Sequence, residues 1–323
     1  MIFPWNNQDI FAQQNSSYSL DQTAEKILLY QRRNGGWAQY NGDPTDYRLP
    51  INEKFKQKLI SDKEKRDATI DDGSTTFEID YLLKAYQKTK NLAYLKSAEK
   101  GIEYLLSAQN SAGGWPQKFP DLNGYHKHIT FNDEAMISVL WIVKGLAENH
   151  SLYEDVNKNI KLRASISLER GIDCILKTQY VQQGKLTAWC AQHDSETLLP
   201  AAARAFEPMS LSGKESVGII KFLESLENPG LVVENSIKAG KEWLASVALP
   251  DVDVLRIETS NGPDNVVVDK PGHFLWARFY DLETNKPIFM GRDRVPHAKL
   301  NEIERERRAG YAYLGDWPKS ILP

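Results

Sequence analysis

The chain has 323 residues, 41% of them hydrophobic, and its 40 basic and 43 acidic residues give a formal net charge of -3. This size and apolar content allow a sizeable buried core, and the lack of a long block of one charge sign argues against a nucleic-acid surface or an anchor to anionic membranes. No apolar run approaches the roughly 20 residues that a membrane-spanning helix needs.

The start of the chain, residues 1–14, has no basic segment followed by an apolar stretch. No secretion signal is therefore predicted from this sequence. Two interpretations stay open: the chain is a mature or trimmed form, or it stays inside the cell.

Three segments repeat one pattern, in which a helix ends in Gln, a polar or glycine-rich turn follows, and Trp then precedes another Gln by two or three residues. The tryptophans are Trp37, Trp115 and Trp189, spaced by 78 and 74 residues. A repeat of this length suits a pair of helices with their loops. The pattern predicts three helical hairpins arranged around a centre.

Apolar residues at spacings of three and four predict one helix before each turn and another after it. Those before the turns are Ala24, Ile27 and Leu28, then Ala98, Ile102 and Leu105, then Leu168, Ile172 and Ile175. Those after the turns are Ile79, Leu82, Leu83 and Tyr86, then Met136, Val139, Leu140 and Val143, then Ile219, Leu223 and Leu226. A further helix is expected over 232–247.

Beyond residue 250 the pattern changes to short β-like runs at 252–258, 266–269 and 274–280. Clusters of Gly and Pro at 261–263 and 271–272 separate these runs, and such clusters mark turns. We therefore expect a helical part over about 20–250 and a small strand-containing lobe over about 251–323 that packs on the helices.

Acidic residues gather at the starts of two of the helices that follow the turns. Asp71 and Asp72 lie in the segment 69–73, and Asp133 ends the related segment 130–133. Equivalent positions of a repeat would bring these carboxylates to one rim. A hard cation such as calcium prefers oxygen ligands of this kind.

A purely structural interpretation of these segments stays open. Thr75 with Glu78, and Thr130 with Asp133, match capping boxes, and acidic residues in a first helical turn are stabilised without any metal. The acidic pair at 71 and 72 lies outside these boxes, although acidic pairs in loops are often only solvated.

The third helix after a turn is expected to begin at a capping box of Ser212 and Glu215. Arg204 lies just upstream and therefore near the same rim. An ion pair with Glu207 is the ordinary explanation for an arginine among apolar neighbours, and it stays open.

Two further arginines, Arg278 and Arg292, lie within or after the predicted strands. Guanidinium groups bind carboxylates through two hydrogen bonds, so both are candidates for binding an acidic ligand. They serve equally well as partners of acidic residues within the lobe.

Other common sites are not indicated. Cys174 and Cys190 are too few for a disulfide scaffold and wrongly spaced for a zinc site, so we interpret both as buried thiols. The sequence has no nucleophile elbow, no phosphate-binding glycine loop and no zinc-protease motif.

Six segments of the chain resemble, in order, motifs of the pectate lyases of polysaccharide lyase family 10. They are 69–75 (TIDDGST), 113–117 (GGWPQ), 128–133 (HITFND), 186–194 (LTAWCAQHD), 204–207 (RAFE) and 291–293 (GRD). The resemblance runs from about residue 20 to 318, and six motifs in order are highly specific. It implies a mainly α fold, an (α/α)3 toroid with a groove for polygalacturonate, forming a single catalytic domain that cuts by β-elimination.

The resemblance also implies roles for individual residues. Asp133 corresponds to the residue that binds the catalytic calcium, and Arg204 corresponds to the Brønsted base. Arg278 and Arg292 correspond to arginines that hold substrate carboxylates.

The acidic pair Asp71 and Asp72 lies where the family places metal- or substrate-facing residues, with Asp71 as a second calcium ligand. Position 72 is more often Asn in the family motif. The tryptophans of the turns, Trp189 among them, are candidates for stacking on sugar rings or for packing between helices.

The implied chemistry suits these residue types. Calcium shared between a galacturonate carboxylate and Asp133 would withdraw charge and make the proton on carbon-5 easier to remove. An arginine base must first lose its own proton, although its pKa normally lies above ~12. We expect calcium, the other two arginines and burial to lower the pKa of Arg204.

The expected partners are polygalacturonate and its oligomers, with no nucleic acid and no membrane, and we expect a monomer. The substrate implies a secreted or periplasmic location although no signal is visible. Two other functions stay open: a toroid glycoside hydrolase that uses Asp71 and Asp133 as acid and base, and a non-catalytic module that binds acidic sugar.

Overall fold

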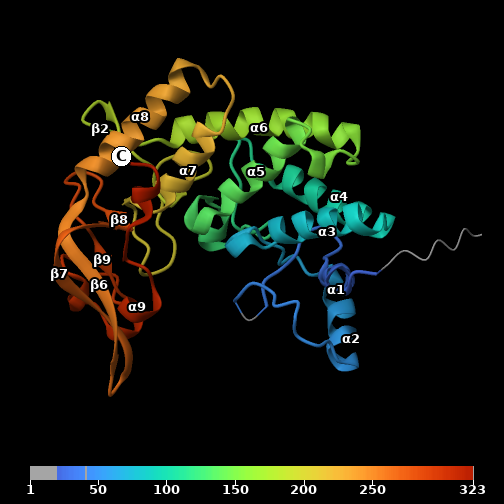
Figure 1. The fold of residues 1–323 in the computed structure, drawn as a ribbon, viewed down its shortest axis with the longest axis horizontal. Coiled ribbons are helices and arrows are strands. Elements are labelled where there is room, and N and C mark those ends of the chain that lie inside the picture. The colour runs from blue at the N-terminus through green and yellow to red at the C-terminus, as the bar shows by residue number, and fades with distance from the viewer. Residues whose placement is uncertain (1–19, 41, 323) are drawn as a thin grey trace, which may run out of the picture.

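The computed structural model describes residues 20–40 and 42–322. The prediction made for residues 1–14 therefore lies outside the described residues. The fold is mainly helical, with a smaller part rich in strands formed by the end of the chain (Figure 1). The α-helices are α1 (Gln22–Tyr30), α2 (Glu53–Ser61), α3 (Thr76–Thr89), α4 (Leu92–Ala108), α5 (Ala135–Ala147), α6 (Lys158–Thr178), α7 (Glu215–Glu224), α8 (Gly230–Ser246) and α9 (Arg305–Gly310).

The helices pack as pairs that follow one another along the chain. Helix α3 packs against α4, α5 against α6, and α7 against α8. Helices α1, α4 and α6 are those predicted before the turns, α3, α5 and α7 those predicted after them, and α8 is the helix expected at 232–247. These helix predictions are confirmed. Among the described residues, no helix is long and apolar enough to cross a membrane.

Helix α2 has no counterpart in the prediction. Only Leu59 of this helix is buried. Its apolar residues are only Phe55, Leu59 and Ile60, so the segment carries a much shorter apolar face than the helices of the repeats.

The tryptophans of the three turns occupy equivalent positions. Each is fully buried, and its indole Nε1 donates a hydrogen bond to a carbonyl oxygen of the helix before the turn. The pairs are Trp37 with Ile27, Trp115 with Leu105 and Trp189 with Ile175, at 2.9, 2.8 and 2.8 Å. The repeat seen in the sequence is therefore a structural repeat.

The glutamines that end the helices tie neighbouring repeats together. The side-chain amide of each donates to a carbonyl oxygen of its own turn and to a carbonyl oxygen of the next helix in the same layer. The residues that accept from the next helix are Ser97 for Gln31, Ser167 for Gln109 and Ser236 for Gln179, at 2.9, 2.9 and 3.0 Å. Helices α1, α4, α6 and α8 are thus joined in a row by one recurring contact.

The glycine of the first two turns is required by a close approach of backbone. Gly35 and Gly113 have positive φ angles of 98° and 89°. A Cβ atom at either position would lie 2.1 or 2.2 Å from the carbonyl oxygen of Lys100 or Arg170. Only glycine lets the turn pack this closely on the next helix.

The strands lie mostly in the C-terminal part. The longest are β6 (Leu249–Thr259) and β7 (Gly262–Ala277), which form an antiparallel ribbon, with β11 (Leu314–Gly315) on the other side of β7. The short antiparallel pairs are β1 (Ile129–Thr130) with β4 (Gln192–His193), β2 (Val181–Gln182) with β3 (Lys185–Leu186), β5 (Leu211–Ser212) with β8 (Phe279–Tyr280) and β9 (Phe289–Met290) with β10 (Pro296–His297).

The predicted break at 271–272 is wrong. Residues 266–269 and 274–277 belong to one strand, β7, which passes through Pro271 and Gly272 opposite an irregularity between Pro250 and Val252. The N–H of Gly272 donates to the side chain of Asp251 at 2.7 Å, which replaces a ladder hydrogen bond. A bulge therefore absorbs the Pro-Gly pair without ending the strand.

The C-terminal lobe packs on the helices as predicted. Strand β8 pairs with β5, and Trp276, Ala277 and Tyr280 belong to the main hydrophobic core. The indole Nε1 of Trp276 donates to the carbonyl oxygen of Leu244 at 2.7 Å. The three turn tryptophans donate in the same way to carbonyl oxygens of α1, α4 and α6.

Both cysteines are buried free thiols, as predicted. Burial raises the pKa of Cys174 to about 12 and that of Cys190 higher still. Neither thiol is therefore ionised at ordinary pH.

Candidate functional site

Two turns carry the predicted acidic residues in one backbone conformation. Asp72 and Asp133 both have left-handed angles, with φ of 47° and 48° and ψ of 36°. In each turn a threonine N–H donates to the carbonyl oxygen of the repeat tryptophan, from Thr69 to Trp37 at 2.9 Å and from Thr130 to Trp115 at 3.1 Å. The two turns contact each other, so their acidic side chains share one rim.

The capping-box interpretation of these two segments is wrong. The hydroxyl of Thr75 accepts a hydrogen bond from the backbone N–H of Trp37 at 2.9 Å instead of capping helix α3. The side chain of Glu78 points into the core, where it accepts from the hydroxyl of Tyr47 at 2.6 Å. The carboxylate of Asp133 binds cationic groups rather than a helix N–H.

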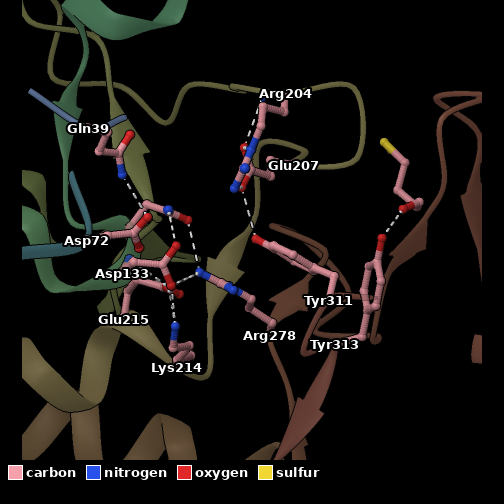
Figure 2. A network of polar contacts seen from close by, with 12 residues as sticks. Gln39, Asp72, Asp133, Arg204, Glu207, Lys214, Glu215, Arg278, Tyr311 and Tyr313 are labelled. Carbon is pink, nitrogen blue, oxygen red and sulfur yellow. Dashed lines mark hydrogen bonds and ion pairs between the residues drawn. The ribbon is translucent and has the colours of Figure 1, made fainter. Parts of the chain in front are cut away.

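Asp133 is the centre of an ion cluster (Figure 2). Its Oδ1 accepts hydrogen bonds from Lys214 Nζ and from Arg278 Nη2, the latter at 2.9 Å. Burial alone would raise the pKa of Asp133, but the charges of Arg278 and Lys214 outweigh it and lower the pKa to about 2. Asp133 is therefore ionised at any ordinary pH.

Arg278 is buried and shared between several protein oxygens. Besides Asp133, its Nη2 contacts Glu215 Oε1 at 2.6 Å and Asn132 Oδ1 at 3.0 Å. Burial would lower the pKa of Arg278, but the charges of Glu215 and Asp133 keep it above its usual value. Its buried Nε has no hydrogen-bond partner among the described residues. Arg278 is thus a fixed cation with a donor still unused.

Lys214 and Glu215 complete the cluster, and the sequence analysis did not identify them as site residues. The hydroxyl of Ser212 accepts from the N–H of Glu215 at 3.0 Å, but helix α7 begins at Glu215 itself, two residues later than a capping box at Ser212 predicts. The side chain of Glu215 is fully buried against Arg278. Its fit to a capping box hid its second role, and no motif singled out the lysine beside it.

Asp71 and Asp72 bring further negative charge to the rim. Burial and the charge of Asp72 raise the pKa of Asp71 to about 6, and burial and the charge of Asp133 raise the pKa of Asp72. Gln39 Nε2 donates to Asp72 at 2.9 Å. Beside Asp71, Gln117 has a buried Oε1 with no hydrogen-bond partner in the described part of the chain. Repelling carboxylates and a free amide oxygen suit a hard cation.

The described residues contain no group of three or more His, Cys, Asp or Glu side chains already arranged around one metal position. Asp133 is neutralised by Lys214 and Arg278 in this structure. At the rim, the carboxylates of Asp71 and Asp72 are therefore more available to a cation than that of Asp133.

Arg204 forms a forked ion pair with Glu207. Arg204 Nε and Nη2 donate to the carboxylate at 2.8 and 2.6 Å, and the hydroxyl of Tyr311 donates to the same carboxylate at 2.9 Å (Figure 2). The ion pair considered from the sequence is confirmed. From the protein groups alone, the pKa of Arg204 is raised rather than lowered, because the hydrogen bonds to Glu207 outweigh burial. The lowering expected from calcium stays a prediction.

Arg204 also faces the acidic rim. Its charge lowers the pKa values of Asp71 and Asp72, although burial and the neighbouring carboxylates outweigh this effect. The guanidinium carbons of Arg204 and Arg278 also lie 5.8 and 4.5 Å from the centre of one ring, that of Tyr311. The Arg204 pair and the Asp133 cluster therefore border the same space.

Arg292 lies outside the ion cluster. Its exposed side chain donates to Glu306 twice, both at 3.0 Å, and its guanidinium carbon is 6.0 Å from the ring of Phe206. Arg204 approaches the same ring at 5.0 Å. Arg292 therefore borders the site from the lobe side without joining the cluster around Asp133.

Trp189 is fully buried, and its Nε1 is bound to the carbonyl oxygen of Ile175. A side chain with no exposed surface has nothing to offer a sugar ring. The prediction that Trp189 binds substrate is wrong, and its role is to pack the third repeat.

The family model described as pectic acid lyase matches residues 31–322. Two similar solved structures are the family 10 polysaccharide lyase from Cellvibrio cellulosa and its aspartate-to-alanine mutant in complex with trigalacturonic acid. Both are 32% identical to this chain with a TM-score of 0.81, and the alignments cover 93% of this chain and 89% and 90% of theirs. The predicted (α/α)3 toroid is confirmed by this match. A comparison with curated protein sequences found no match.

Proposed function

The chain belongs to the pectic acid lyase family, and from this premise we propose that it cleaves polygalacturonate by calcium-assisted β-elimination, giving unsaturated oligogalacturonides. Its enzyme class is pectate lyase. A similar enzyme, 32% identical, was solved with trigalacturonic acid. An oligogalacturonide is therefore the ligand expected at the rim.

The observation that carries this proposal is the meeting of two ion systems at one rim. The Asp133 cluster with Arg278 and Lys214 borders the same space as the Arg204 pair, since Arg204 and Arg278 both face the ring of Tyr311. Guanidinium and ammonium groups attract the carboxylates of a galacturonate chain, while the ionised aspartates favour a divalent cation between protein and substrate.

We assign the calcium to Asp71, Asp72 and Asp133. Burial first, and neighbouring carboxylates second, raise the pKa values of Asp71 and Asp72, and a bound divalent cation offsets both effects. Gln117 Oε1 is an unused oxygen beside them. When bound, calcium withdraws charge from the substrate carboxylate and so makes the proton on carbon-5 more acidic.

Arg278 and Lys214 then stabilise the negative charge that develops on the substrate carboxylate. Arg278 suits this role because its position is fixed by Glu215 and Asn132 before substrate arrives. A preorganised cation stabilises a transition state without reorganisation.

Arg204 is the base in this proposal. Glu207 engages Nε and Nη2, and no hydrogen bond within the described residues engages Nη1. The neutral guanidine accepts the carbon-5 proton at Nη1, the electron pair forms the carbon-4 to carbon-5 double bond, and the glycosidic bond breaks. The leaving oxygen takes a proton from solvent. Since Glu207 raises the pKa of Arg204, the neutral form is scarce and activity should rise with pH.

The test uses polygalacturonate with calcium and follows the ultraviolet absorbance of the unsaturated product, with a chelator control. Arg204→Ala should abolish turnover while trigalacturonate still binds, and Arg204→Lys should retain little activity because it lacks the planar fork. Arg163→Ala, which removes a distant arginine paired with Glu103, is the matched control and should keep full activity. Full activity in Arg204→Ala would remove Arg204 from the base role.

We also propose that the enzyme works as a monomer in the periplasm or outside the cell, since its polymeric substrate lies there. Fractionation of producing cells, with activity measured in each fraction, tests the location. Light scattering tests the monomer.

A further inference from the structure

Tyr311 contacts both halves of the site. The guanidinium carbon of Arg278 lies 4.5 Å from the centre of its ring, and that of Arg204 lies 5.8 Å away. Its hydroxyl donates to Glu207 Oε1 at 2.9 Å (Figure 2). One side chain from the lobe therefore links Arg204 to the cluster around Asp133.

The hydroxyl of Tyr311 restrains the partner of Arg204. Glu207 is 2% exposed and accepts hydrogen bonds from Nε, Nη2 and the backbone N–H of Arg204, which lies only three residues away. A carboxylate held by this one local turn would shift whenever the turn shifts. The bond from Tyr311, 104 residues further along the chain, ties it to the lobe.

The ring of Tyr311 is itself held in place. It packs edge-on against Phe206 at 5.2 Å and stacks on Phe279 at 6.2 Å between ring centres. Because these neighbours prevent the ring from turning, its hydroxyl stays directed at Glu207. The ring also sets the separation between Arg204 and Arg278.

We propose that Tyr311 is a positioning residue for the elimination: through Glu207 it fixes which edge of the Arg204 guanidinium faces the sugar. This inference rests on the proposed function of Arg204. Tyr311 does not touch the reacting atoms, and it acts on the rate through the orientation of Arg204. A misplacement of about 1 Å in such a group costs up to about a hundredfold in rate.

The test compares Tyr311→Phe with Tyr313→Phe. The first removes the hydroxyl and keeps the ring against both arginines. The second removes a neighbouring hydroxyl that donates to the carbonyl oxygen of Met290 at 2.5 Å and touches neither arginine. We expect kcat of Tyr311→Phe to fall about tenfold or more with KM within about twofold. Tyr313→Phe should keep kcat within about twofold and lose only thermal stability.

A second set of variants tests the route through Glu207. If Tyr311 acts through this carboxylate, Tyr311→Phe in a Glu207→Ala background costs no further activity, because the hydroxyl has lost its partner. Independent, additive losses would overturn the inference. Equal kcat values for Tyr311→Phe and Tyr313→Phe would overturn it as well.

One measurement does not depend on turnover. The Nε–H signal of Arg204 in the NMR spectrum, assigned with Arg204→Lys, reports the fork to Glu207 directly. It should broaden or move in Tyr311→Phe and stay unchanged in Tyr313→Phe. An unchanged signal in Tyr311→Phe refutes the inference even in an active enzyme. A wild-type protein without lyase activity refutes the proposed function, and the signal then tests only whether Tyr311 holds Glu207 and Arg204 in place.

Discussion

Asp133 and Arg278 are 145 residues apart in the sequence, yet they form an ion pair at 2.9 Å where the helices meet the C-terminal lobe. The aspartate comes from the turn before α5, and the arginine follows strand β7. Each side chain provides the opposite charge that stabilises the other away from water. The helical part and the lobe must therefore come together to form the site.

Calcium should bind about tenfold more weakly to Asp71→Asn than to the wild type, since the variant loses one carboxylate ligand. Isothermal titration and the rise in melting temperature on adding calcium both measure this. Because the pKa of Asp71 is about 6, protons compete with calcium below that pH, and wild-type affinity should fall as the pH drops through 6. Asp173→Asn, at an exposed ion pair on α6, should leave affinity unchanged. Equal dissociation constants for Asp71→Asn and wild type would refute this ligand assignment.

Glu207→Gln should move the rising limb of the pH–rate profile to lower pH. The hydrogen bonds to Glu207 favour charged Arg204, and nearby Tyr311 and Tyr125 act in the same direction. Without the carboxylate charge, the pKa of Arg204 falls and more of it is neutral at a given pH, even if misplacement lowers the maximal rate.

The profile is measured as kcat from neutral to strongly alkaline pH. Glu306→Gln is the matched control, since Glu306 pairs with Arg292 and Arg307 instead. If the rising limb of the profile keeps its pH in Glu207→Gln, or moves to higher pH, Arg204 is not the base.

Glu78→Gln should stabilise the fold at neutral and alkaline pH. Burial raises the pKa of Glu78 from 4.5 to about 7, and its Oε2 is buried without a partner among the described residues. The folded state thus holds a proton that the unfolded state releases, so stability is greatest below 4.5 and declines as the pH rises through 7.

Glutamine keeps an oxygen for the hydroxyl of Tyr47 and does not titrate. Urea unfolding should therefore give nearly equal stabilities at acidic pH and a variant up to about 3 kcal/mol more stable above pH 7. Parallel curves for wild type and variant would show that Glu78 does not titrate in this range.

Gly113→Ala should destabilise the fold by about 2 to 3 kcal/mol more than Gly184→Ala. Both glycines have positive φ, 89° and 77°, so both variants suffer the backbone strain of roughly 1 to 2 kcal/mol. Only at Gly113 does the new Cβ meet a carbonyl oxygen, that of Arg170 at 2.2 Å, whereas the surroundings of Gly184 are open. Thermal melts that fall equally would show that the turn can move away from α6.

Local periodicity and spacing were enough to predict the helices and the repeat. Apolar faces predicted α1 and α3 to α8, and the shared position of Trp37, Trp115 and Trp189 indicated equivalent turns. Helix α2 was not predicted from the sequence, because it buries a single leucine. Strand β7 was predicted as two separate runs, because a bulge accommodates a Pro-Gly pair that normally ends a strand.

The site was only partly predictable for a different reason. Asp133 and Arg204 could be identified because motifs around them are local, whereas their partners come from distant segments. Nothing in the sequence near Tyr311 indicates that its hydroxyl binds Glu207, 104 residues away. Trp189 was misjudged because a tryptophan in a turn looks the same in sequence whether it faces solvent or core.

The contact of Trp276 with α8 affects when the site can form during synthesis of the chain. With this contact the lobe stands where a fourth repeat would begin and ends the row of helices. Arg278 follows two residues later, so a nascent chain still on the ribosome carries an Asp133 that lacks its strongest counter-charge. Under the proposed mechanism, the site is therefore complete only after the lobe has been synthesised and has packed on α8.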